Sequence, residues 1–188
     1  MLYRPMTPPH TTRHSGASLI EVLVAIVILS FGMLALGAML TYSVQAPKLS
    51  AYRATAASLA SAHVERIRAN PDGFGNDNYT SSLSYDGTTT PLAVTNCTYP
   101  SCTVAALATM DNTVTRQAVR AALPAGGMIM KCDVSLCTSG SYGNLWIVWL
   151  EPSTASTLNP TTSDNCPSEV TASFSNPPPR CLYLRFKI

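Results

Sequence analysis

An uncharged apolar run near the N-terminus constrains this chain more than any other feature. From Val22 to Leu40 no side chain carries a charge, and Glu21 stands directly before this run. At about 1.5 Å of rise per residue, a helix of this length crosses most of a bilayer core. An ionisable group beside such a run usually marks function. The alternative is that Glu21 lies at the headgroup level, where water reaches it, and contributes nothing.

The charges and cysteines that flank the run predict its orientation. Residues 1–16 contain Arg4 and Arg13 but no acid, and positive charge favours the cytoplasmic side. All six cysteines follow position 96, as expected in an exported compartment where disulfides persist. We therefore expect a single membrane pass with the N-terminus inside and an exported C-terminal domain.

Without residues 1–16 the chain has ten basic and ten acidic residues. A formally neutral chain argues against a broad electrostatic surface for nucleic acid or anionic lipid. No nucleic-acid partner is predicted.

A second helical pattern follows the apolar run. Apolar residues and one histidine recur every three or four positions, which places them on one helix face: Leu49, Tyr52, Ala56, Leu59, His63 and Ile67. Pro47 should kink this helix, and the sequence from Asn70 to Gly73 should end it. We expect residues 17–46 to form the membrane half of one long helix. The amphipathic half, about residues 47–70, should pack on a globular domain that extends over residues 47–188.

Further elements are expected within that domain. Residues 76–96 read as a loop with at most a short strand at 80–85. A helix should begin at Cys102-Thr103, break near residues 110–112 and bury an inner face, which we expect to consist of Val114, Ala118, Ala121 and Ala122. Strands are predicted at residues 128–134, 145–151 and 181–188, with a long loop over residues 152–179. The middle strand is apolar on both faces, as in a central strand.

The cysteines have a regular spacing. Two pairs share the C-x4-C spacing and a third brackets the long loop, so sequential pairing is the simplest connectivity: Cys97 with Cys102, Cys132 with Cys137, and Cys166 with Cys181. The rival is a zinc site, but His63 is the only histidine that follows Gly16. We predict bridges and no metal or other cofactor.

Catalysis has little support in this sequence. A catalytic set needs a tuned base beside a nucleophile, and the helical spacing of His63 indicates a packed, hydrogen-bonded residue instead. No phosphate loop, paired carboxylate motif or metal signature is present. We therefore predict no catalytic residue and no enzymatic activity.

Gly16, followed by Ala17-Ser18-Leu19-Ile20-Glu21-Val22 and the run to Leu40, resembles the cleavage and N-methylation signal of type IV pilins and pseudopilins. The resemblance implies that a prepilin peptidase removes residues 1–16 by cutting after Gly16 and then methylates the new amine of Ala17. Most such chains begin with Phe at that position, and this one departs from them with Ala17. Glu21 would then attract the amine of a neighbouring subunit during assembly. A rival interpretation is an ordinary secretory signal cut after Ala35-Leu36-Gly37.

The whole layout is similar to PilV-type minor pilins of Gram-negative bacteria. The later parallels are Cys102-Thr103, Arg116 to Leu123-Pro124 with Gly126, the strand Trp146-Ile147-Val148-Trp149, and the strand Cys181 to Arg185. This resemblance implies an α+β fold in which a long N-terminal helix packs on a small antiparallel sheet.

The resemblance also implies a function. Such proteins prime type IV pilus assembly, enter the pilus and support adhesion or twitching motility. The implied partners are other minor pilins, the major pilin, the prepilin peptidase and the inner-membrane assembly platform, with a tip adhesin as a further candidate. The chain would lie first in the inner membrane and then in the pilus at the cell surface.

Two other functions stay open. A minor pseudopilin of a type II secretion system would share the N-terminal chemistry. A signal-anchored periplasmic binding or enzymatic domain would instead begin at Met1 or after the apolar run.

Overall fold

The computed structural model describes residue 16, residues 18–151 and residues 164–188. The expected leader before Gly16, Ala17 and the first part of the loop at 152–179 lie outside these residues. The chain divides into two compact units, one ending at Val44 and the other covering Gln45–Ile188, and each is described separately.

The first unit consists of the N-terminal stretch of α1, a helix that runs Leu19–Ala69. Leu, Ile, Ala and Met favour the helical state, and a helix satisfies its own backbone groups in an apolar medium. Every residue of α1 up to Val44 is exposed. By length and composition α1 could cross a membrane. Pro47 lies inside the helix, and the kink expected there stays a prediction.

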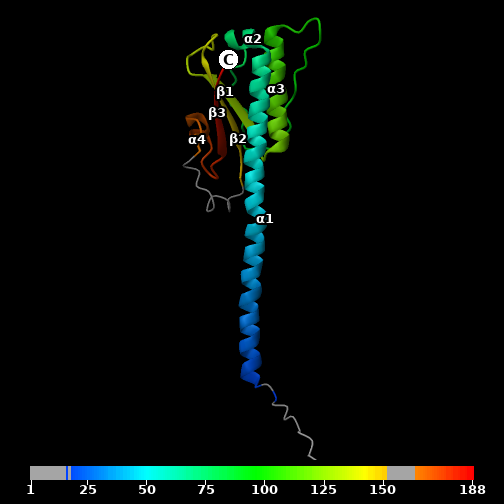
Figure 1. Cartoon of the computed structure of the whole chain (residues 1–188), viewed down its shortest axis with the longest axis vertical. Coiled ribbons are helices and arrows are strands. Elements are labelled where there is room, and N and C mark those ends of the chain that lie inside the picture. The colour runs from blue at the N-terminus through cyan, green and yellow to red at the C-terminus, as the bar shows by residue number, and fades with distance from the viewer. Residues whose placement is uncertain (1–15, 17, 152–163) are drawn as a thin grey trace, which may run out of the picture. The chain divides into compact units, whose positions relative to one another are not determined.

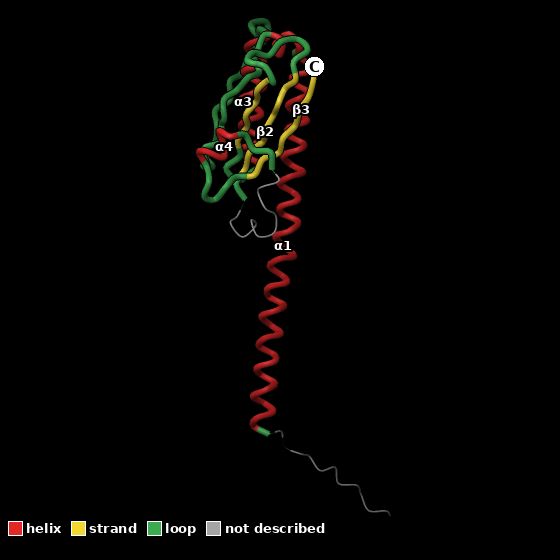
Figure 2. Tube along the Cα trace, turned by 90° about the vertical axis from the view of Figure 1, so that its left-hand side faces the viewer, coloured by secondary structure: helices red, strands yellow, loops and turns green. Residues whose placement is uncertain are grey.

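The second unit contains one antiparallel sheet in the order β1-β2-β3. The strands are β1 at Gly127–Cys132, β2 at Tyr142–Trp149 and β3 at Arg180–Lys187. Figure 2 shows β2 and β3 running side by side, with Leu145 opposite Leu184 in register. The apolar strand is the central one, as its sequence predicts.

Two helices cover the inner face of this sheet. The C-terminal stretch of α1 presents one buried stripe, and Figure 1 shows α3, at Val104–Ala122, alongside it. The buried sides of α1 and α3 and the inner face of the sheet share one hydrophobic core. Its largest members are Trp149, Tyr79, Phe74, Ile67, Met128 and Met130. A smaller cluster under α4, Ser168–Ser173, covers part of the outer face. The fold is therefore the predicted α+β arrangement of a long N-terminal helix on a small antiparallel sheet.

Two expectations about α3 are wrong. The helix is unbroken through residues 110–112, because Asp111 and Asn112 turn inward and bond to Tyr79 instead of disrupting the backbone. The predicted inner face is also misplaced, since Ala121 and Ala122 are exposed while Ala108, Thr115 and Val119 are buried.

Short helices occupy two segments where none was expected. The helix α2 runs Pro71–Gly75 directly after α1, with the Asn70 side chain accepting a hydrogen bond from the N–H of Gly73. The helix α4 interrupts the second half of the long loop. The segment at 80–85 forms a single bridge between Ser81 and Met130.

Candidate functional site

The N-terminal segment presents its functional candidates at the start of α1. Gly16 is exposed, and Ala17 lies outside the described residues. The Ser18 carbonyl accepts hydrogen bonds from the N–H groups of Glu21, at 2.9 Å, and Val22, at 3.2 Å. Glu21 is thus exposed in the first helical turn, where the helix dipole favours a carboxylate. Within the described residues no ion pair involves Glu21.

Beyond Glu21, α1 offers an apolar face with a small residue at its centre. Ala25, Ile28, Leu29, Gly32 and Met33 line a shallow depression. A Cβ atom built on Gly32 meets no atom within 4 Å. Small residues let helices approach closely in an apolar medium, so this face suits a neighbouring helix.

Three disulfides staple the second unit. The bridges are Cys97–Cys102, Cys132–Cys137 and Cys166–Cys181. The first two close short loops, and the third ties the segment before α4 to the start of β3. Each bridge restricts the unfolded chain and stabilises a domain with a small core.

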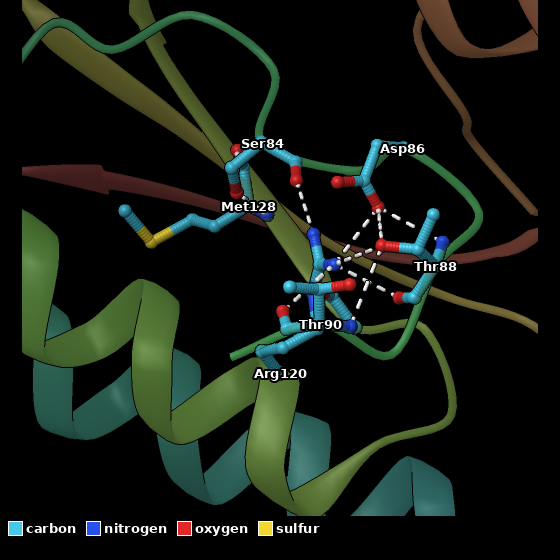
Figure 3. Close-up of polar contacts among 7 residues, drawn as sticks. Ser84, Asp86, Thr88, Thr90, Arg120 and Met128 are labelled. Atoms are coloured by element: carbon cyan, nitrogen blue, oxygen red, sulfur yellow. Dashed lines mark hydrogen bonds and ion pairs between the residues drawn. The ribbon is translucent and has the colours of Figure 1, made fainter. Parts of the chain in front are cut away.

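A buried arginine holds the segment that follows Ser84 (Figure 3). The Arg120 guanidinium donates to the carbonyls of Ser84 at 2.7 Å, Thr88 at 2.8 Å and Thr90 at 3.4 Å. It also pairs with the Asp86 carboxylate at 2.8 Å, and its Nε donates to the Gly126 carbonyl at 2.6 Å. Only 1% of the Arg120 side chain is exposed, so these acceptors replace its hydration. We call Arg120 and these acceptors the Arg120 clamp.

The clamp also sets the charge state of Asp86. Burial alone would raise the pKa of this carboxyl, but hydrogen bonds from Thr88 and Arg120 outweigh it and leave the pKa below its ordinary value. Asp86 is therefore ionised at neutral pH and neutralises the buried guanidinium. Neither residue stands out in the sequence, because 36 residues separate Arg120 from Ser84 and no short motif joins them.

A polar layer joins α1 to α3. His63 is fully buried, and its Nδ1 lies 2.9 Å from Thr115 Oγ1, which also accepts from Arg66 at 2.8 Å. Burial, followed by the charges of Arg66 and Arg116, lowers the pKa of His63 to about 3. This imidazole is therefore neutral at neutral pH, and it is a packed, hydrogen-bonded residue as its spacing predicts.

The same layer continues through Tyr79. Its hydroxyl donates to Asp111 at 2.6 Å and accepts from Asn70 at 3.2 Å. Burial, and then the bond to Asp111, raises the pKa of Tyr79 above its ordinary value. The layer fixes α1, α3 and the segment around Tyr79 against one another.

A second buried polar group links α1 to the start of β3. Asp164 pairs with Arg53 of α1 at 3.3 Å and with Arg180 at 2.8 Å, and Arg180 also approaches Glu151 at 3.5 Å. Glu151 in turn accepts from the Trp149 indole N–H at 3.2 Å. Opposite charges thus compensate one another beside the core, as buried ions require.

The described part of the chain offers little to a metal ion. No group of three or more His, Cys, Asp or Glu side chains there is placed to hold one. Every cysteine is bridged, which removes thiolates as ligands. The polar clusters described above contain side chains that are bonded to structural partners.

Comparisons with known proteins add independent findings. A family model described as prokaryotic N-terminal methylation motif matches residues 11–37. A second model, Tt1218-like, described as type IV pilin Tt1218, matches residues 38–113. No curated protein and no solved structure matches the chain.

The two matched regions adjoin each other and together include all of α1 and the first half of α3. The first spans Gly16, Ala17 and Glu21, and the second includes His63 and Tyr79. Residues 11–37 are thus similar to the prepilin N-methylation motif and residues 38–113 to a type IV pilin, and these findings together support the assignment of the chain as a type IV pilin.

Proposed function

We propose that this chain is a minor pilin of the PilV type, cut after Gly16 and methylated on Ala17. It assembles with other minor pilins to prime the type IV pilus and then enters the pilus, where it supports adhesion or twitching motility. The observation that carries the proposal is the exposed N-terminal stretch of α1, which is uncharged from Val22 to Leu40 and has one carboxylate, Glu21, in its first turn. A structural subunit of this kind needs no catalytic residue.

Glu21 acts as a docking group in this proposal. A carboxylate and an amine about 4 Å apart attract by about 4 kcal/mol at an effective dielectric of 20, against about 1 kcal/mol in water. The attraction therefore grows when a neighbouring subunit replaces water around the helix start. It also favours the register that brings the methylated amine of Ala17 on one chain to Glu21 on the next.

Processing is tested by the mass of the product. Gly16→Leu puts a bulky side chain at the cut and should leave the full-length chain in the membrane fraction. Gly16→Ala changes the same position by one methyl group and should be cut at least in part. Normal processing of Gly16→Leu would refute the assigned cleavage site.

Assembly is tested by the amount of protein in sheared pili. Glu21→Gln keeps the size of the side chain and removes its charge, so we expect membrane insertion as in the parent chain but at least tenfold less incorporation. Glu21→Asp keeps the charge and should retain a measurable part of the incorporation into pili. Glu65→Gln is the matched control, because Glu65 is an exposed carboxylate on the same helix that pairs with Arg68 at 2.6 Å. Equal incorporation of Glu21→Gln and Glu65→Gln would contradict the docking role.

The apolar helix and the methylation motif support membrane anchoring followed by incorporation into a pilus. We propose an inner-membrane, N-in orientation with residues 47–188 in the periplasm. The proposed partners are other minor pilins, the major pilin, the prepilin peptidase and the assembly platform, with a tip adhesin as a further candidate. Loss of pili in a deletion strain with intact secretion supports the pilus role, whereas lost secretion with intact pili would identify a type II pseudopilin.

A further inference from the structure

The two edges of the sheet differ in how their backbone groups are bonded. The outer edge of β1 is closed by the segment at 81–84. Ser81 and Met130 exchange backbone hydrogen bonds of 2.9 and 3.3 Å. The Met128 carbonyl accepts from the Ser84 N–H at 3.0 Å, and the Met128 N–H donates to Ser84 Oγ at 2.9 Å. Two of the three outward-facing residues of β1, Met128 and Met130, are therefore bonded to this segment.

The edge of β3 also has backbone N–H and C=O groups that point away from the sheet. Cys181 lies opposite Val148 in register, yet its N–H donates to the Asp164 carboxylate at 3.4 Å. Because hydrogen-bonded and non-bonded pairs alternate in an antiparallel ladder, the N–H and C=O groups of Tyr183, Arg185 and Lys187 also point away from β2. No hydrogen bond from another described residue reaches these groups. We call residues 183–187 the free edge.

The charged side chains of the free edge lean across the sheet. The Arg185 guanidinium carbon lies 4.1 Å from the centre of the Tyr142 ring, and Lys187 Nζ lies 5.3 Å from it. Charged residues on an edge strand often block pairing, but these two lie over the Tyr142 ring of β2 instead of across the outer edge of β3. On the inner face Leu182, Leu184 and Ile188 are only partly buried, so an added strand would cover them.

The positive charges of Arg185 and Lys187 determine which side chains a strand paired with the free edge should carry. Antiparallel pairing with a second β3 would bring Arg185 and Lys187 of both copies onto one face, and such like-charge neighbours are destabilising. Asp133 approaches Arg185 at 3.5 Å, whereas no described carboxylate pairs with Lys187. The free edge therefore disfavours its own copy and favours acidic side chains.

We propose that the free edge docks an extended segment of another protein, which adds to the sheet as a fourth strand. The segment alternates acidic residues, which face Arg185 and Lys187, with apolar residues, which cover Leu184 and Ile188. Main-chain hydrogen bonds supply affinity in such strand addition, and the alternating side chains supply specificity. This surface lies in the second unit, so the inference goes beyond the proposed function and does not depend on processing after Gly16.

The test uses the full chain in detergent micelles and a short synthetic peptide in which valine and glutamate alternate. We expect saturable binding with Kd below about 1 mM, and at least tenfold weaker binding of a valine–lysine peptide. Bound peptide should slow amide hydrogen exchange at Tyr183, Arg185 and Lys187 at least tenfold. A valine–glutamate peptide that is N-methylated at alternate residues cannot donate to the edge and should not bind.

Two variants at one position separate backbone from side-chain effects. Arg185→Pro removes an N–H that points away from β2, a position where an edge strand accepts proline, and should abolish binding. Arg185→Ala keeps the N–H and should weaken binding only a few-fold. If Arg185→Pro does not fold, the amide hydrogen exchange rates of the unmodified chain with and without the peptide test the proposal instead.

Four outcomes would overturn the proposal: no saturable binding of the valine–glutamate peptide, equal binding of the N-methylated peptide, equal binding of the lysine peptide, or unchanged amide exchange at the free edge. Self-association of the chain that the peptide displaces would show that a second copy occupies the edge, and would overturn the choice of occupant.

Discussion

Acidification should destabilise the second unit through His63. The side chain is fully buried against Thr115, and Arg66 and Arg116 face it from α1 and α3, with Tyr79 edge-on to its ring. Protonation would place a third positive charge in this layer without exposure to water. The native state therefore holds the imidazole neutral down to about pH 3.

The size of the effect follows from the two pKa values. In the unfolded chain the imidazole has its ordinary pKa of 6.5, against about 3 in the folded chain. Between these values the unfolded state binds the extra proton, so stability falls as the pH falls. The loss is about 1.4 kcal/mol per pH unit well below 6.5, which gives about 2 kcal/mol between pH 8 and pH 5.

The assay is chemical unfolding of the full chain in detergent micelles at several pH values. The chain has three histidines, and replacing His10 and His14 with asparagine leaves His63 as the only one. Ordinary carboxyl groups titrate below this window. Adding His63→Gln to that background should flatten the pH dependence between pH 8 and pH 5, whatever its effect on stability at pH 8.

Histidine NMR shifts provide a second measurement on the folded chain. A His63 ring that titrates near pH 6.5 in the folded state would refute the lowered pKa. A loss of less than about 0.5 kcal/mol by the single-histidine chain between pH 8 and pH 5, well below the linkage value, would refute it too.

Three further predictions concern the second unit, each measured by denaturant unfolding at pH 8. Arg120→Met removes the donor from the Arg120 clamp and should cost about 3–5 kcal/mol, because it leaves buried carbonyls unbonded. Replacing Cys166 and Cys181 together with alanine should cost about 3 kcal/mol, since that bridge closes a 15-residue separation. Gly127→Ala should cost about 1–3 kcal/mol, because the added Cβ would lie 2.4 Å from the backbone nitrogen of Tyr85.

Each of these predictions has a matched control. Asp86→Asn keeps a hydrogen-bond acceptor in the clamp and should cost clearly less than the arginine change, so equal costs would contradict a clamp made mainly of carbonyls. Removing the Cys97–Cys102 bridge, which closes a shorter loop, should cost about 2 kcal/mol, and a larger loss there than at the longer loop would contradict the entropic account. Gly32→Ala meets no atom within 4 Å and should not destabilise the second unit.

Local pattern was sufficient to predict the elements with one clear periodicity. The stripe that includes Ala56, His63 and Ile67 is buried as expected, and the apolar strand lies at the centre of the sheet. The inner face of α3 differs from the predicted one, because polar residues are ordinarily expected to be exposed. Asp111 and Thr115 are buried since each finds a partner, Tyr79 or His63, that is distant in the chain and becomes a neighbour only on folding.

The functional candidates also divide into those that the sequence can predict and those that only the fold brings together. The signal around Gly16 and Glu21 is contiguous in the sequence, so it is recognisable without a structure. The Arg120 clamp and the free edge of β3 depend on which segments become neighbours after folding. No periodicity shows that residues 81–84 pair with one sheet edge while no described segment pairs with the other.

The Arg120 clamp has a consequence for how this protein can diverge. Four of its acceptors are main-chain carbonyls, those of Ser84, Thr88, Thr90 and Gly126. The arginine thus recognises the path of the backbone rather than the identity of most side chains along it. The exposed side chains of Thr89 and Thr90 are therefore free to change, while one buried side chain fixes the course of the backbone there. This surface can therefore vary with little loss of stability.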